Sequence, residues 1–227
     1  MNAISRLVMR RMLRRIIAQP RPRDAMLRFV FYTEEFVERY DIQPVLPHLS
    51  EDERAAMLAH FRDERSHARA LRKYCQDHGL RIERSAAEDA LINRSDEGYA
   101  QYLRHLDPAS NRFTPEDMYA YYCHVHVQEE LANELYGAVA DTLERQREHP
   151  RLVRILRAFA ASEAEHQGYA RAFMAKYEPR LGKRHCRRVL GRTRIDSAVT
   201  GARFFRDFLK LLVAEHAFQP GPLAVAL

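Results

Sequence analysis

Two Glu-x-x-His motifs carry residue types that bind metal ions, and both lie where a helix is expected to be apolar. Glu64 and His67 form the first motif, and Glu163 and His166 form the second. Residues three apart lie on one face of a helix, so each pair can bind one ion. The stripes that contain them, at steps of three and four residues, are otherwise largely apolar. Because an unpartnered buried carboxylate is costly, this pattern indicates inward-facing metal ligands.

Each motif is preceded by a helical stripe with a single glutamate, Glu34 before the first and Glu129 before the second. Four converging carboxylates repel one another, and two dications between them would neutralise most of that charge. Carboxylate and imidazole together suit iron or manganese, whereas zinc sites often use thiolate as well. We therefore predict two iron ions, with manganese as the alternative. The predicted ligands are Glu34, Glu64, His67, Glu129, Glu163 and His166.

The two single glutamates have close competitors. Glu35 competes with Glu34, and both Glu130 and Glu134 compete with Glu129. The apolar company of Glu34 and Glu129 along their stripes favours these two as the inward-facing residues.

Two further histidines lie one turn before candidate ligands. His60 precedes Glu64 and is a candidate extra ligand, a hydrogen-bond partner of a ligand, or a histidine near the core. His126 precedes Glu129 and could hydrogen-bond a ligand carboxylate or face solvent.

The elements that must position these residues are all helical, because strand-like alternation is nearly absent. Ser50 and Glu53 form the signature of a capping box, and Thr114-Pro115 marks another helix start. The periodicity predicts an all-α fold with four core helices, a long crossover over 80–112 containing a shorter helix at 86–106, and extra helices at both ends. The core helices are expected over 24–40, 50–79, 114–148 and 149–177, and the last amphipathic helix over 197–218.

The net charge of +6 is unevenly distributed along the 227 residues. Residues 1–23 contain seven Arg and no acid, and residues 179–194 contain seven Lys or Arg and no acid. We divide the chain into a basic amphipathic N-terminal segment (1–23), a di-metal bundle (24–178), and a basic linker with a C-terminal helix packing on the bundle (179–227). Contact of the basic flanks with nucleic acid or membrane remains open.

The three cysteines, Cys75, Cys123 and Cys186, have neither metal-finger nor redox spacing. We expect reduced thiols and a cytoplasmic location. No apolar run approaches the roughly 20 residues that cross a bilayer.

The order Glu, Glu-x-x-His, Glu, Glu-x-x-His on four successive helices resembles the ferritin-like di-iron carboxylate proteins, over about Asp24–Tyr177. Within them, Asp63-Glu64-Arg65-Ser66-His67 is similar to the signature of the p-aminobenzoate N-oxygenase type. That type has an extra histidine one turn before its second motif. This chain has Phe159 at that place, whereas His60 precedes the first motif.

The resemblance implies a ferritin-like four-helix bundle and an O2-activating di-iron enzyme: an oxidase, hydroxylase or N-oxygenase of a small organic substrate. Electrons would come from an external ferredoxin or reductase, because no flavin, nicotinamide or iron–sulfur motif is found in the sequence. A homodimer is also considered. The alternatives are a rubrerythrin-like peroxidase, an iron-storage protein, or a di-iron hydroxylase of a tRNA or a membrane quinone.

Overall fold

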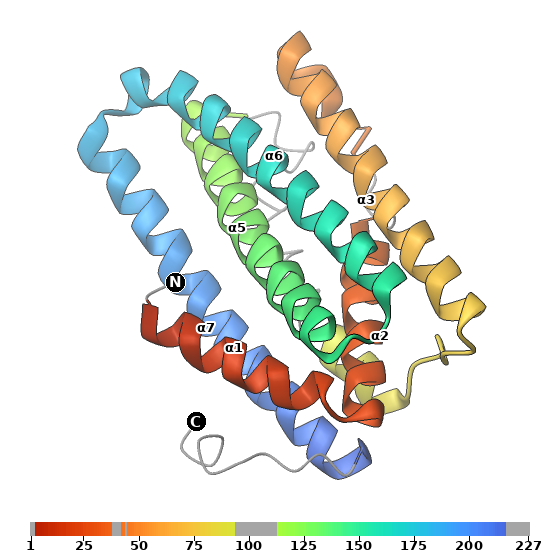
Figure 1. The fold of residues 1–227 in the computed structure, drawn as a ribbon. Helices are drawn as coiled ribbons and strands as arrows, with labels where there is room; N and C mark the ends of the chain where they lie inside the picture. The colour runs from red at the N-terminus through yellow and green to blue at the C-terminus, as the bar shows by residue number, and fades with distance from the viewer. Residues whose placement is uncertain (1–2, 38–41, 44, 94–112, 217–227) are drawn as a thin grey trace.

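The computed structural model describes residues 3–37, 42–43, 45–93 and 113–216, and this part of the chain is all-α, with no strand (Figure 1). Residues 86–93 form a further helical segment. Among the described helices, none combines the length and the apolar character that a bilayer crossing requires. The elements are α1 (Ala3–Ile17), α2 (Pro20–Val37), the 3-10 helix η1 (Leu46–His48), α3 (Glu51–Asp77), α5 (Pro115–Gln146), α6 (Pro150–Leu181) and α7 (Lys183–His216).

The helix starts follow from local side-chain chemistry. At α3 the Ser50 amide donates to Glu53 at 3.2 Å, and the predicted capping box is confirmed. At α5 the Asp117 amide donates to the Thr114 hydroxyl at 3.2 Å, so this helix also begins where the sequence predicts. Gly79 follows α3 with φ of +62°, a conformation that glycine adopts without strain.

Four helices, α2, α3, α5 and α6, surround a common interior. Helices α5 and α6 run antiparallel along most of their length, and α3 lies against α2 and α6 (Figure 1). Helices α1 and α7 pack against the outside of α5. Two apolar clusters fill the interior, and along α5 Val125 belongs to one and Tyr136 to the other. Glu129 lies between them, so the polar residues form a layer between two apolar ones.

The basic flanks are helical. In residues 1–23, α1 buries Met12, Leu13, Ile16 and Ile17 in the core and exposes arginines. The linker expected within 179–194 is wrong as secondary structure, because α6 continues to Leu181 and α7 begins at Lys183 after a single break at Gly182. Arginine and lysine favour helix, and buried Cys186 with half-buried Val189 and Leu190 attaches this helical segment to the protein.

Other expected bounds differ by a few residues. The first core helix begins at Pro20 rather than at Asp24. The last predicted helix is the C-terminal part of α7. Of the short crossover helix expected over 86–106, residues 86–93 are helical and the remainder lies outside the described residues.

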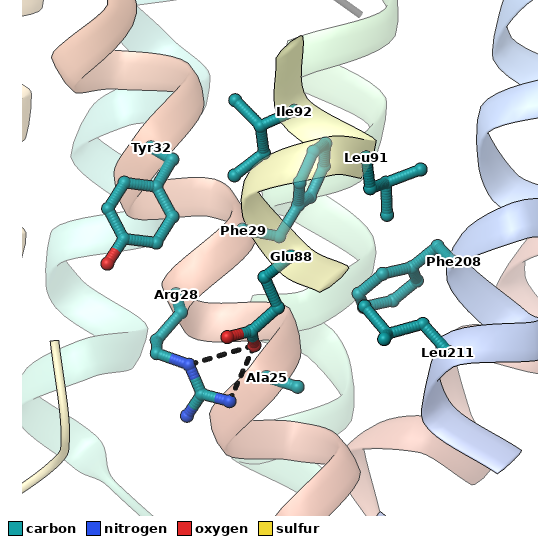
Figure 2. Close-up of a pocket in the computed structure, with 9 residues that line it drawn as sticks. All are labelled: Ala25, Arg28, Phe29, Tyr32, Glu88, Leu91, Ile92, Phe208 and Leu211. Atoms are coloured by element: carbon teal, nitrogen blue, oxygen red, sulfur yellow. Dashed lines mark hydrogen bonds and ion pairs between the residues drawn. The ribbon is translucent and has the colours of Figure 1, made fainter. Parts of the chain in front are cut away.

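A buried ion pair attaches the crossover to α2 (Figure 2). The Arg28 guanidinium donates to Glu88 Oε1 at 2.7 and 3.1 Å, and both side chains are 7% exposed. Glu88 also accepts from the Ser85 amide at 2.8 Å, which caps the 86–93 helix. Phe29 of α2 and Phe208 of α7 line the same small pocket. This contact joins α2, the crossover and α7 at one place.

Candidate metal centre

All six residues predicted as metal ligands are buried in the interior between the four helices. They come from α2 (Glu34), α3 (Glu64 and His67), α5 (Glu129) and α6 (Glu163 and His166). The structure therefore brings together side chains that are up to 132 residues apart in the sequence, from Glu34 to His166.

These side chains form two overlapping groups that could each hold a metal ion. In each group, one ligand atom from every residue lies within 4.8 Å of the others. Glu64 belongs to both groups, as expected of a carboxylate that bridges two ions. The first group is Glu34, Glu64, His67 and Glu163, and the second is His60, Glu64, Glu129 and His166.

The first group is centred on the His67 ring. His67 Nδ1 lies 3.1 Å from Glu34 Oε2, 3.3 Å from Glu163 Oε1 and 3.9 Å from Glu64 Oε2. Three carboxylates thus converge on one imidazole nitrogen. A single cation placed between these four groups would be within reach of all of them.

The second group includes His60, one of the two extra histidines of the sequence analysis. His60 Nε2 lies 3.1 Å from Glu64 Oε1 and 3.2 Å from Glu129 Oε1. On the other side, His166 Nδ1 lies 3.6 Å from Glu64 Oε1 and 2.7 Å from Glu163 Oε2. The second group therefore has two imidazoles and the first group has one.

Among the described residues, no lysine or arginine forms an ion pair with the four carboxylates. Within the described part of the chain, every ion-pair contact of Glu34, Glu64, Glu129 and Glu163 is with a histidine. Burial, and next the charge of Glu64, raise the pKa of Glu34 well above its usual 4.5. Burial also raises the pKa of Glu129 to about 8, against the opposing effect of His60. These carboxylates are poorly stabilised as anions by the protein alone.

The remaining shifts arise from the histidine contacts. Burial acts to raise the pKa of Glu163, but hydrogen bonds, that from His166 first, lower it to about 2. Burial opposes charge on His60, yet its bonds to Glu129 and Glu64 raise its pKa well above 6.5. Glu163 Oε1 is buried and faces His67 Nδ1 at 3.3 Å, a contact without hydrogen-bond geometry. A buried carboxylate oxygen of this kind, in a set of oxygen and imidazole donors, fits a bound cation.

Two residues outside the predicted ligand set contact it directly. The Tyr136 hydroxyl donates to Glu34 Oε1, from a position 102 residues along the chain. His166 Nε2 lies 3.4 Å from Asp63 Oδ2, so an acid faces the ring nitrogen that points away from the centre. Such outer partners fix the orientation of a metal-binding histidine. Asp63 belongs to the quoted motif and Tyr136 to the apolar stripe of α5, but neither pattern reveals these contacts.

The competing residues lie elsewhere. Glu35 pairs with Arg72 at 2.6 Å, and Glu130 pairs with Arg194 at 3.6 Å. Glu134 and His126 are in neither group. His126 is buried, and its Nδ1 lies 3.5 Å from the Gln167 carbonyl oxygen rather than beside a carboxylate.

A small pocket borders the second group, where His60 and His166 form part of its wall. Four aromatic side chains form part of the remaining wall, and the free space is on the order of one or two water molecules. The first group is closed by the Phe159 ring, which stacks on His67 with centroids 4.0 Å apart. The two groups therefore differ in access as well as in histidine content. The aromatic wall is formed by Tyr121, Tyr122, Tyr169 and Phe173.

Comparison with protein-family models, with curated proteins and with solved structures gives no match for this chain. The buried Glu and His groups could hold metal ions. That they bind two irons stays a prediction from their chemistry and from the motif resemblance.

Proposed function

We propose that this protein is an O2-activating di-iron oxygenase that acts on a small organic substrate within a ferritin-like four-helix bundle. One observation carries the proposal: two adjacent donor groups share Glu64, and the described residues place no lysine or arginine against their four carboxylates. A two-metal site with a shared carboxylate explains why the core contains these charges.

The protein's residues divide into those that would hold the metals and those that position them. Glu34 and His67 would bind one ion and Glu129 and His166 the other, with Glu64 between them and Glu163 beside both histidines. Two ferrous ions bound there would supply the reducing chemistry that O2 activation requires. The Tyr136 hydroxyl occupies one oxygen of Glu34, which leaves the other oxygen for a metal.

The two sides of the centre suggest where a substrate binds. Phe159 and Tyr136 exclude water from the first group, so reactive species are shielded on that side. The pocket against His60 and His166 is the side from which O2 and substrate approach. Because its free space is small, an organic substrate binds only after the surrounding aromatic side chains shift.

The proposal is tested by anaerobic titration of the purified protein with Fe(II), followed by exposure to O2. We expect about two equivalents of iron to bind, and O2 to be consumed faster than by the same Fe(II) in buffer. Glu163→Ala should lose both properties. Glu165→Ala, which changes an exposed glutamate two residues away on α6, should keep them.

Each result decides a part of the proposal. A folded protein that binds neither iron nor manganese would overturn the metal centre. Two bound equivalents without accelerated O2 consumption would overturn the oxygenase. Accumulation of iron far beyond two equivalents in a very large particle would indicate storage instead.

A further inference from the structure

The outer face of α7 differs from the rest of the surface, because cationic and aliphatic side chains follow one another along it in short groups. Its members recur at steps of three and four residues, which places them on one side of the helix. All are exposed, and none is acidic. The outer face consists of Arg184, Arg188, Arg192, Ile195, Val199, Ala202, Arg206, Lys210 and Val213.

The aliphatic side chains of this face are unusually exposed. Ile195 is 65% exposed, Val213 48% and Val199 45%. Among the described residues only one other large hydrophobic side chain is comparably exposed, Leu58 at 44% on α3. Single exposed hydrophobic residues are ordinary, but a group of them on one helix face indicates a contact surface.

The charge of α7 reinforces this distinction. The helix contains nine Lys and Arg and three acids, a net of +6, and the whole chain also has +6. Two of the acids lie beside the outer face, where Asp196 is 3.7 Å from Arg192 and Asp207 is 3.0 Å from Arg206. Arg184 and Arg188 extend the positive charge beyond these pairs.

The orientation of this face is fixed by packing. Phe208 and Leu212 are buried at 2% and 0% exposure in the core with α1 and α2, and Cys186 is buried near the start of the helix. The outer face therefore points away from the protein. Figure 1 shows α7, in blue, along one edge of the molecule, with α5 and α6 between it and α3.

We propose that the outer face of α7 lies on the surface of an anionic lipid bilayer. Arginine and lysine are attracted to acidic headgroups, while the aliphatic side chains enter the boundary between headgroups and acyl chains. From Arg184 to Val213 the face extends about 44 Å at the rise of an α-helix. A planar surface can contact a straight line of that length.

Other occupants match these features less well. Single-stranded nucleic acid is held by aromatic side chains that stack on bases, and the outer face has aliphatic side chains in their place. A protein partner normally covers a compact patch of about 800 Å² rather than a narrow line. A second copy paired through the same face would bring arginine against arginine and lysine.

The test is co-sedimentation of the full chain with vesicles. We expect binding to phosphatidylcholine vesicles that contain about a third phosphatidylglycerol, and none to phosphatidylcholine alone. Raising the salt from about 0.05 to 0.5 M should weaken binding at least tenfold, because it shortens the range of the attraction. Two double variants, Arg184→Glu with Arg188→Glu and Ile195→Asp with Val199→Asp, should each weaken it at least tenfold.

Matched controls come from α3. Leu58→Asp alters the one comparably exposed large hydrophobic residue outside α7 in the described part of the chain, and Arg65→Glu with Arg69→Glu reverses two exposed arginines four residues apart. Both controls should bind vesicles as the unaltered protein does, and unchanged melting temperatures would show that every variant is folded. Absence of binding to the acidic vesicles, equal loss in the α3 and α7 variants, or salt-sensitive binding to a uridine oligonucleotide without vesicle binding would each overturn the proposal. None of these results depends on metal content.

Discussion

Buried carboxylates occur in two regions of this protein, and the two regions compensate for them in opposite ways. Glu88 faces the Arg28 guanidinium at 2.7 Å and the Ser85 amide at 2.8 Å. Burial acts to raise the pKa of Glu88, but these hydrogen bonds outweigh it and lower the pKa. At the centre, Glu34 and Glu129 are also buried, and their pKa values are raised.

In the part of the chain that the structure describes, the central carboxylates lack the cationic partner that Glu88 has. Where the fold needs a stable buried anion, it places an arginine beside it, as at Glu88. At the centre the basic side chains that the described residues place beside the carboxylates are all histidines, and histidines are themselves metal ligands. The central carboxylates therefore favour a bound cation, because the described residues supply no lysine or arginine to compensate them.

Loss of the shared carboxylate should give the largest effect. Because Glu64 belongs to both groups, Glu64→Ala should abolish binding of both iron equivalents, measured by elemental analysis after anaerobic loading. Glu35→Ala removes a carboxylate from α2 that pairs with Arg72, and this variant should retain two equivalents. Loss of only one equivalent in Glu64→Ala would contradict the bridging position.

The next largest effect is on the free energy of unfolding. Substitutions at the Arg28–Glu88 pair and at the central carboxylates should change it differently. Arg28→Ala leaves Glu88 buried without its cation and should lower the free energy of unfolding by about 3–5 kcal/mol. Glu34→Gln removes a carboxylate that has no such partner, so the metal-free protein should melt at the same or a higher temperature. Thermal and denaturant unfolding of both variants measure this, and equal destabilisation would remove the distinction between the regions.

Local sequence patterns predict the ligands but not their partners. Glu64, His67, Glu163 and His166 interrupt apolar stripes of period 3.6, and such stripes are local information. The Tyr136 contact to Glu34 joins residues 102 apart. It depends on how α2 and α5 are rotated about their axes, which no single helix pattern determines.

The limits of local helix patterns also explain the outcomes for His60 and for residues 179–194. His60 had three possible roles in the sequence, and only the packing of α3 on its neighbours places it 3.2 Å from Glu129. Residues 179–194 were expected to form a linker because of their basic composition. That inference overlooked the spacing of Cys186, Val189 and Leu190, which place one side of α7 against the protein.

The stability of the metal-free protein should depend on pH, because burial raises the pKa values of central carboxylates. Between pH 4.5 and about 8 the folded, metal-free protein keeps a proton on Glu129 that the unfolded chain has lost. This stabilisation is complete below pH 4.5 and disappears as the pH rises through about 8. Glu34 and His60, whose pKa values are also raised, act in the same direction, while the lowered pKa of Glu163 acts mainly below pH 4.5.

The melting temperature of the metal-free protein should therefore fall from pH 5 to pH 8. With metal bound it should fall less or rise, because the ligands bind as deprotonated groups, so the difference between the two forms widens. Scanning calorimetry in both forms measures this. Glu129→Gln should flatten the metal-free curve, and a metal-free protein that becomes more stable over this range would contradict the assignment.

The smallest effect should come from His60, which distinguishes the two groups from each other. His60→Ala leaves Glu64, Glu129 and His166 in the second group and leaves the first group complete. One equivalent should then bind about 10- to 100-fold more weakly, as when a supporting group of a metal site is removed, while the other keeps its affinity. Titration with Co(II), followed by absorbance, separates the two equivalents.

His126→Ala is the matched control on α5, because His126 is buried but contacts the Gln167 carbonyl instead. Equal weakening of both equivalents in His60→Ala would show that the groups do not act as separate sites, and no weakening would show that His60 is no ligand.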